Sequence, residues 1–291
     1  MENAVNPTYC AIMGLAVGDA LGVPFEFLRR DTFSVTDMVG YGTHCQPPGT
    51  WSDDTSMTLA TLDSFRCLGK IDLNDLMQRF VNWAYYGSYT AHGDMFDIGG
   101  TTSRALEKYR KYGKPQNCGG SSVRDNGNGS LMRILPLAFI PHTKMDVYQV
   151  SALTHAHEIS VMACRHYLMV VEKLLSGANK KDALKSLEYE CDGVFIRVPI
   201  IDEYPREKIQ SSGYVVDTLE AALWCFMKTE NYRDCVITAV ELGDDTDTVA
   251  AVAGGLAGVY YGVGGEKGIP EEWIEKIARK EWIAELTAQK A

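Results

Sequence analysis

The sequence lacks paired cysteines and long apolar runs. Its eight cysteines form no CxxC pair and none lies at zinc-finger spacing from a histidine, so neither a disulfide framework nor a structural zinc site is indicated. No run approaches the roughly 20 apolar residues of a membrane span, and the N-terminus has no basic segment followed by an apolar core. We therefore expect reduced thiols and a cytoplasmic protein without a membrane partner.

Basic charge is also scarce. The chain of 291 residues has 28 Lys and Arg against 38 Asp and Glu, a formal net charge of -10. Such a protein repels phosphate backbones and anionic lipid, although a local pocket for one small anion is still allowed. Nucleic acid is therefore not an expected partner.

Helical periodicity is what the sequence does have. Apolar residues recur at helical spacing over the following ranges: 7–21, 54–68, 73–86, 102–111, 130–139, 145–155, 158–175, 180–186, 216–229, 232–242 and 246–261. Strand signals are limited to stretches such as 193–200, which an extended loop would explain equally well. These patterns predict an all-α fold.

A short acidic stretch raises the first question of chemistry. Ser52 to Thr55 places Asp53 and Asp54 between two hydroxyls, directly before an apolar helical pattern. A helix N-cap explains one acid, because carboxylates and hydroxyls accept from the free N–H groups of a first turn. The second acid is surplus to capping and suits a hard divalent cation.

The same excess recurs near the C-terminus, where GDDTDT (243–248) opens a helix rich in Ala and Gly. Such a helix has poor intrinsic propensity and is expected to be buried, with neighbouring backbones packed closely. Acids carried inward repel one another unless a cation neutralises them. We therefore expect each stretch to form half of a metal site. The first half-site consists of Ser52, Asp53 and Asp54, and the second consists of Asp245, Asp247 and Thr248.

The two halves must meet, because neither offers the six oxygens that Mg²⁺ or Mn²⁺ prefers. Together they supply four carboxylates, which match the charge of two such ions. Contact between residues near 53 and near 247 also indicates a single domain that spans residues 1–291, whereas the chain length alone suggests roughly two domains.

Five motifs in order make the chain resemble the ADP-ribosylglycohydrolases. They are GLAVGDALGVPFEF (14–27), WSDDT (51–55), DIGGTT (97–102), NGNGSLMR (126–133) and GDDTDT (243–248). Each is weak alone, whereas the ordered set is specific and covers nearly the whole chain. The resemblance implies a compact orthogonal bundle of helices with two Mg²⁺ or Mn²⁺ ions at the base of an ADP-ribose cleft.

The resemblance also implies roles for individual residues. Ser52, Asp53, Asp54, Asp245, Asp247 and Thr248 match metal ligands, and Glu26 matches a carboxylate near the metals. Asp97 matches an acid typical of the arginine-directed branch. Either Glu26 or Asp54 is expected to polarise the attacking water. The expected substrate-binding residues are Asn126, Gly127, Asn128, Gly129, Ser130 and His155, with the glycine loop running into a helix that receives pyrophosphate.

The activity that follows from these assignments is hydrolysis of the N-glycosidic bond between ADP-ribose and arginine side chains of modified proteins, which releases ADP-ribose. Alternatives are a serine or acetyl-ester linkage to ADP-ribose, or a relative that binds ADP-ribose without turnover. No interface is readable, so a monomer is the default expectation.

Overall fold

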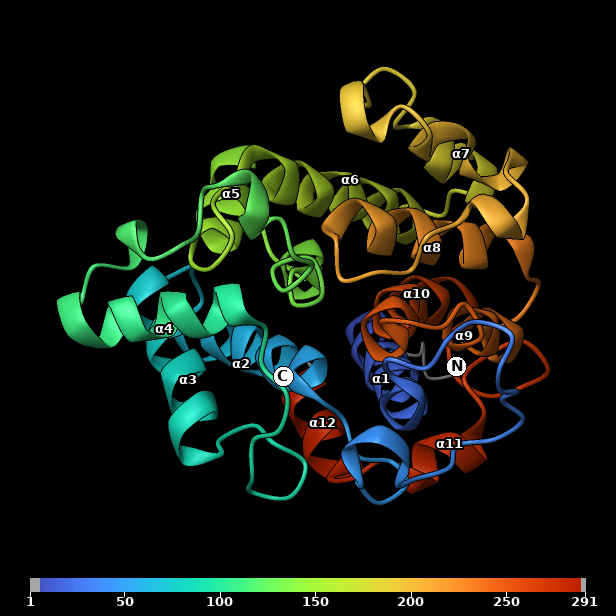
Figure 1. Ribbon diagram of the computed structural model, residues 1–291, viewed down its shortest axis with the longest axis horizontal. Helices are drawn as coiled ribbons and strands as arrows, with labels where there is room; N and C mark the ends of the chain where they lie inside the picture. The colour runs from blue at the N-terminus through green and yellow to red at the C-terminus, as the bar shows by residue number, and fades with distance from the viewer. Residues whose placement is uncertain (1–5, 289–291) are drawn as a thin grey trace.

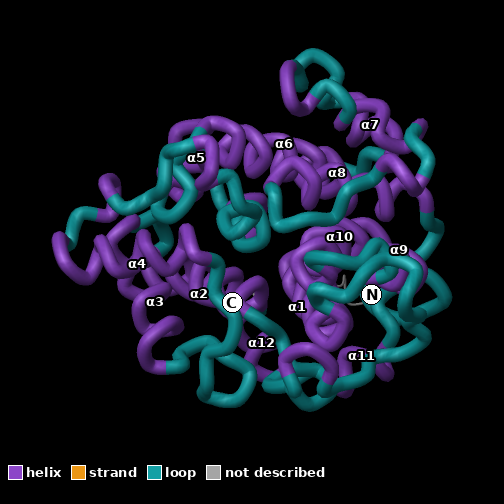
Figure 2. The backbone as a smooth tube through the Cα atoms, viewed as in Figure 1, coloured by secondary structure: helices purple, strands orange, loops and turns teal. Residues whose placement is uncertain are grey.

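The apolar periodicity of the sequence becomes a set of α-helices joined by turns and short 3-10 helices. The computed structural model describes residues 6–288, and within them no strand forms, only isolated bridges such as Gly127 to Tyr214 (Figure 2). The α-helices are α1 (Pro7–Gly22), α2 (Asp53–Leu68), α3 (Leu73–Tyr86), α4 (Gly100–Tyr112), α5 (Lys144–Ala152), α6 (Glu158–Leu175), α7 (Lys180–Lys185), α8 (Val215–Lys228), α9 (Tyr232–Val240), α10 (Thr246–Tyr261), α11 (Glu271–Lys276) and α12 (Lys280–Thr287). The predicted all-α fold is confirmed.

The short 3-10 helices lie in the connections between these helices. They are η1 (Val23–Phe25), η2 (Gly42–His44), η3 (Pro115–Asn117), η4 (Val123–Asp125), η5 (Leu135–Phe139), η6 (Gly193–Phe195), η7 (Val198–Glu203) and η8 (Arg206–Lys208).

The predicted helix over 130–139 is wrong. Residues 130–133 form turns, and a 3-10 helix begins only at Leu135, with Pro136 in its first turn. Nearly every side chain in this segment is buried, so its apolar run reflects burial on all sides rather than one face of an amphipathic helix. Residues 193–200 also form 3-10 turns, not a strand.

One expectation about membranes needs correction. The continuous helical segment Pro7–Phe25 is 19 residues long, with a mean hydropathy of 1.4, which is enough by length and composition to cross a membrane. However, 83% of its apolar window is buried inside the protein. Its apolar side chains therefore contribute to the core.

The two most apolar helices, α1 and α10, lie side by side (Figure 1) and make the most extensive contact between any two of the described elements. Glycines along α1 allow this approach. A Cβ on Gly18 would lie 2.1 Å from the Ala250 carbonyl oxygen, and one on Gly22 would lie 2.4 Å from the Cα of Asp247. The N-terminus of α10, which carries the second acidic stretch, is thereby pressed against the end of α1.

Several of the remaining helices pack against this pair. Helices α6, α8 and α9 pack against α10, while α2 and α12 pack against α1. One cluster of buried apolar side chains extends from Ala11 to Leu286.

Gly18→Ala tests the close packing of α1 on α10. The added methyl group meets backbone that cannot move aside, so we expect a loss of about 3 kcal/mol in the free energy of unfolding. Urea denaturation followed by circular dichroism measures it. Gly100→Ala is the control, because a Cβ there meets only the end of the Arg104 side chain at 3.3 Å. Equal stability of the two variants would contradict the packing argument.

Candidate functional site

The first acidic stretch begins helix α2. The Ser52 side chain is the N-cap and accepts from the Asp54 amide at 3.3 Å. Asp53 and Asp54 occupy the first turn, and both are buried. Capping is therefore carried out by Ser52, which leaves the two carboxylates available for another purpose.

The second acidic stretch begins helix α10 and meets the first. Asp245 is the N-cap residue, although its side chain makes no capping hydrogen bond, and Asp247 follows in the first turn. The Thr248 hydroxyl donates to Asp54 Oδ2 at 3.3 Å. The two half-sites that are remote in the sequence thus lie in contact.

The carboxylates are arranged as ligands around shared positions. Single oxygens of Asp19, Asp54 and Asp247 lie within 4.8 Å of one another, and so do those of Glu26, Asp245 and Asp247. Three buried carboxylate oxygens have no hydrogen-bond partner in the described structure, namely Asp54 Oδ1, Asp245 Oδ1 and Asp247 Oδ2. Buried, unpaired carboxylate oxygens that converge from two helices fit hard divalent cations.

Asp19 belongs to this cluster, although we did not assign it from the sequence. It accepts from the Ser52 amide at 2.9 Å, and from the Thr55 amide and hydroxyl at 3.0 and 2.6 Å. Its burial raises its pKa to about 6 against the lowering effect of these bonds. The available signal was a single acid within the apolar sequence GLAVGDALG, where a charge has to be used.

Burial and mutual repulsion raise the pKa values throughout the cluster. Desolvation is the largest cause at Asp53, Asp54 and Asp247, whose pKa values are raised well above the usual range, and neighbouring carboxylates add to it. The pKa of Asp245 is also raised by burial, while the Asn128 amide, which donates to its Oδ2 at 2.8 Å, opposes the shift. A divalent cation would reverse these shifts, because its charge favours the ionised form.

A cleft of about 270 Å³ opens above the cluster. The predicted site residues that line it are Glu26, Asp53, Asp97, Gly127, Asn128, Gly129, His155, Asp245 and Thr248. Asp54 and Asp247 lie behind this surface. The cleft therefore joins the acidic cluster to most of the predicted substrate-binding residues.

The backbone at or beside two carboxylates of the cleft, Asp97 and Glu26, is strained or held by hydrogen bonds. Asp97 has a φ of 55° and the neighbour of Glu26, Phe27, has a φ of 66°, conformations that cluster at functional sites. The Phe27 amide donates to the Asp244 carbonyl at 2.7 Å, and the Asp244 amide to that of Leu28 at 2.8 Å. Exposed Asp244 thus contributes through its backbone, which holds the loop carrying Glu26.

His44 is a second residue that the sequence did not reveal. Its Nε2 contacts Glu26 Oε2, which raises the pKa of the histidine. Burial raises the pKa of Glu26 to about 7, and the bond to His44 opposes that shift. In the metal-free protein, the Glu26 carboxylate is therefore expected to exchange a proton near neutral pH.

The glycine loop differs from its expected form. It does not run into an α-helix, since residues 130–133 are turns. Asn126 donates to the Val123 carbonyl at 3.1 Å, and Ser130 accepts from the Ser151 hydroxyl at 3.0 Å. Neither lines the cleft, so their side chains hold the loop while Gly127, Asn128 and Gly129 face the cavity.

A helix N-terminus does reach the cleft, from a different segment. Helix α4 begins after Gly99, whose position as N-cap provides no side-chain bond, and residues 99–102 line the cavity. Its first amides are available to an anionic group. The positive end of a helix dipole at the cleft therefore comes from α4, and the prediction that residues 130–139 provide it is wrong.

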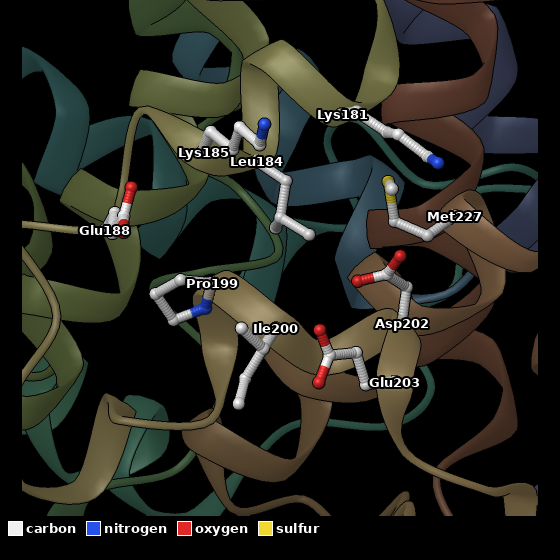
Figure 3. Close-up of a pocket in the computed structure, with 9 residues that line it drawn as sticks. All are labelled: Lys181, Leu184, Lys185, Glu188, Pro199, Ile200, Asp202, Glu203 and Met227. Atoms are coloured by element: carbon white, nitrogen blue, oxygen red, sulfur yellow. The ribbon is translucent and has the colours of Figure 1, made fainter.

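A separate hollow of about 330 Å³ lies between α7 and η7 (Figure 3). Its wall mixes Lys181 and Lys185 with Asp202, Glu203 and apolar side chains. It contains none of the predicted site residues, so the acidic cleft is the candidate site.

Comparison with known proteins agrees with this geometry. The family model described as ADP-ribosylglycohydrolase matches residues 8–291. The chain belongs to the ADP-ribosylglycohydrolase family. Among curated proteins, the ADP-ribosylarginine hydrolase Tri1 of Serratia proteamaculans is 36% identical, with 96% of this chain and 77% of that protein covered.

Two further similar proteins support the assignment of this chain to the glycohydrolase family. The ADP-ribosyl-[dinitrogen reductase] glycohydrolase of Rhodospirillum rubrum is 33% identical, covering 93% of this chain and 90% of that protein. A solved structure described as an ADP-ribosylglycohydrolase-related protein complex superposes with a TM-score of 0.83 at 33% identity, covering 97% and 95% of the two chains. The predicted family and its helical fold are confirmed.

The raised pKa values predict how the stability of the metal-free glycohydrolase depends on pH. Glu26 and Asp19 have folded pKa values of about 7 and about 6, above those of free carboxyls. Their stabilising contribution is complete below an unfolded pKa of about 4 and is lost as pH rises through the folded values. In chelator, we expect the melting temperature to fall between pH 5 and pH 8.

Added Mg²⁺ or Mn²⁺ should remove most of this fall, because cation binding stabilises the ionised cluster. Asp247→Asn should flatten the pH profile in chelator, whereas Asp202→Asn, in the α7 hollow, should leave it unchanged. A melting temperature that rises from pH 5 to pH 8 in chelator would contradict the charge description of the site.

Proposed function

We propose that this glycohydrolase removes ADP-ribose from arginine side chains of modified proteins, using two Mg²⁺ or Mn²⁺ ions. The observation that carries the proposal is the pair of acidic helix ends meeting at the base of the cleft, with three buried carboxylate oxygens unpaired. The relatives named for arginine-linked ADP-ribose span nearly all of this chain. Asp97 lies in the same cleft.

The proposed metal ligands follow from the cluster. Asp54, Asp245 and Asp247 present unpaired oxygens, and Asp53 and Thr248 reach the same cavity wall. Ser52 lies next to them with its hydroxyl 3.0 Å from Asp54 Oδ2. When bound, the ions supply Lewis-acid polarisation of a water molecule and of the ribose hydroxyls.

The carboxylates of the cleft have distinct proposed tasks. An arginine guanidine leaves more easily if it remains protonated, and Asp97 can hold that positive charge by a charge-assisted hydrogen bond. Glu26 is better placed than Asp54 to accept the proton of the attacking water, because Glu26 lines the cleft and contacts His44, whereas Asp54 lies behind the cleft surface. The transition state is expected to resemble an oxocarbenium ion, as in other glycosidic cleavage.

The pyrophosphate of ADP-ribose fits between the loop 127–129 and the start of α4. The start of α4 offers first-turn amides without a side-chain cap to the cavity, and its dipole favours negative charge there. A protein with a net charge of -10 can bind an anion in this way without a cluster of basic side chains. Asn128, His155 and Thr102 are the polar side chains beside that position.

The linkage is tested by comparing release of ADP-ribose from ADP-ribosylarginine, ADP-ribosylserine and O-acetyl-ADP-ribose, each with and without chelator. We expect the arginine conjugate to react fastest, and chelator to abolish its turnover. Faster release from the serine or acetyl conjugate would overturn the arginine assignment. Tight binding of ADP-ribose without release from any conjugate would identify a non-catalytic relative.

A matched pair of variants tests the metal ligands. Asp245→Asn should lower kcat/KM for ADP-ribosylarginine by at least about 100-fold, because it removes a ligand rather than an outer-shell partner. Asp244→Asn changes the adjacent exposed acid, which acts through its backbone, and should retain activity. Both should fold, as circular dichroism would verify. Full activity of the Asp245 variant would refute the two-metal proposal.

Asp97→Asn tests the task given to this carboxylate. Asn tolerates the same left-handed backbone, so the loop is expected to keep its shape. Loss of one charge that stabilises the leaving guanidinium should lower kcat on the arginine conjugate by about 100-fold. The affinity for ADP-ribose, which has no guanidine, should change little by calorimetry, and an equal loss in both measurements would contradict this assignment.

A further inference from the structure

Arg133 is a buried cation whose purpose the proposed mechanism does not explain. Its side chain is fully buried, and Nη2 donates to the Val150 carbonyl at 3.1 Å and to the Thr154 hydroxyl oxygen at 2.8 Å. Its guanidinium lies 4.7 Å from the ring centre of Phe80, and no carboxylate pairs with it within residues 6–288. Burying a charge without a carboxylate partner is costly. The groups that accept its two hydrogen bonds therefore indicate what the buried arginine does.

The second of these bonds leads to the cleft. The Thr154 hydroxyl lies 2.8 Å from Nδ1 of His155, and both side chains are buried. Arg133, Thr154 and His155 therefore form a chain of contacts that runs from the core to a histidine lining the cavity.

Donor and acceptor chemistry sets the direction of this chain. Arginine can only donate, so the Thr154 oxygen accepts from Arg133, and its single hydrogen is left for another partner. Within the described residues, the His155 Nδ1 is the acceptor in reach of that hydrogen. If Nδ1 carried the proton instead, the threonine hydrogen would be buried without a partner, which is unfavourable.

We propose that Arg133 and Thr154 are positioning residues that hold His155 as the neutral tautomer protonated at Nε2, so that it donates a hydrogen bond to an oxygen of the ligand in the cleft. The tautomer follows from contacts within the chain. The identity of the ligand as ADP-ribose rests on the proposed function.

The Nε2 edge of the ring faces the glycine loop. A Cβ built on Gly127 would lie 3.4 Å from Nε2, and one on Gly129 would lie 2.8 Å from Cε1 of His155 and 3.0 Å from the Thr102 hydroxyl. The Thr102 hydroxyl is itself buried without a hydrogen-bond partner. Two side-chain donors thus flank the position that glycine leaves open, which suits a ligand oxygen.

The backbone on either side of the histidine is also held. The Gly120 amide donates to the Thr154 carbonyl at 2.9 Å, and the Ala156 amide donates to the Gly120 carbonyl at 2.7 Å. Burial, with the charge of Arg133, lowers the pKa of His155 to about 3. The ring therefore stays a neutral donor, with its orientation determined by Nδ1.

If Arg133 only stabilised the fold, it would do so through its other hydrogen bond, which goes to the Val150 carbonyl. Val150 lies in the last turn of α5, and a donor to its carbonyl caps that helix. Thr154→Val separates the two roles, since it removes the hydroxyl that reaches His155 and leaves the Arg133 bond to Val150 in place. Thr154→Ser keeps the hydroxyl and is the matched control.

The tautomer is measured by long-range ¹H–¹⁵N correlation of the histidine rings in the metal-free protein, with His155→Gln used to assign the signals. We expect a protonated Nε2 and an unprotonated Nδ1 for His155 in the wild type and in Thr154→Ser. In Thr154→Val we expect a mixture of tautomers. These spectra do not depend on hydrolysis, so failure of the arginine assignment leaves this result unaffected.

The consequence for binding is measured by calorimetry with ADP-ribose. Thr154→Val should weaken binding about tenfold, as expected for the loss of one hydrogen bond, while Thr154→Ser stays within about twofold of the wild type. A wild-type His155 protonated at Nδ1 would overturn the proposal even if Thr154→Val failed to fold. An unchanged tautomer in Thr154→Val, or equal weakening of binding in both variants, would also overturn it.

Discussion

The close contact between α1 and α10 is the constraint on which the site depends. Gly18 and Gly22 let the α10 backbone approach until its first turn touches the end of α1. That approach carries Asp247 to Asp19 and leaves Asp245 facing Glu26, which follows η1 directly. A Cβ on Gly18 would lie 2.1 Å from the Ala250 carbonyl oxygen and one on Gly22 would lie 2.4 Å from the Asp247 Cα, so a larger residue at either glycine would force the helices apart beside the cluster.

The convergence of so many carboxylates is electrostatically unfavourable in the metal-free protein. Desolvation and repulsion raise the pKa values of Asp53, Asp54 and Asp247 together, so the metal-free fold favours their protonated forms. Hydroxyls and amides, such as those of Ser52 and Asn128, satisfy some of the oxygens. Those that remain unpaired define the direction from which a cation would complete the structure.

Recognition of an anionic ligand by an acidic protein follows a related principle. The cleft presents the first amides of α4 and a histidine whose pKa is lowered to about 3, rather than a group of lysines. Neutral donors avoid pairing with the nearby carboxylates, which would capture a mobile cationic side chain. Positive charge at Arg133 is kept behind the surface, where it orients a donor instead of binding directly.

The helical fold, the duplicated acidic helix starts and the family could be predicted from the sequence, because periodicity, capping chemistry and ordered motifs are local properties of the chain. Most helix positions agreed with the structure, but the apolar segment 130–139 was misread as a helix because burial on all sides resembles amphipathic periodicity. Asp19 and His44 were not assigned either, since each acts through contacts with residues distant in the sequence. Two features could not be predicted in this way. The start of α4, rather than the segment after the glycine loop, brings a helix dipole to the cleft, and Arg133 reaches His155 through Thr154. Hydrogen-bond direction and helix-end placement depend on how distant elements pack, and no local pattern in the chain records that packing.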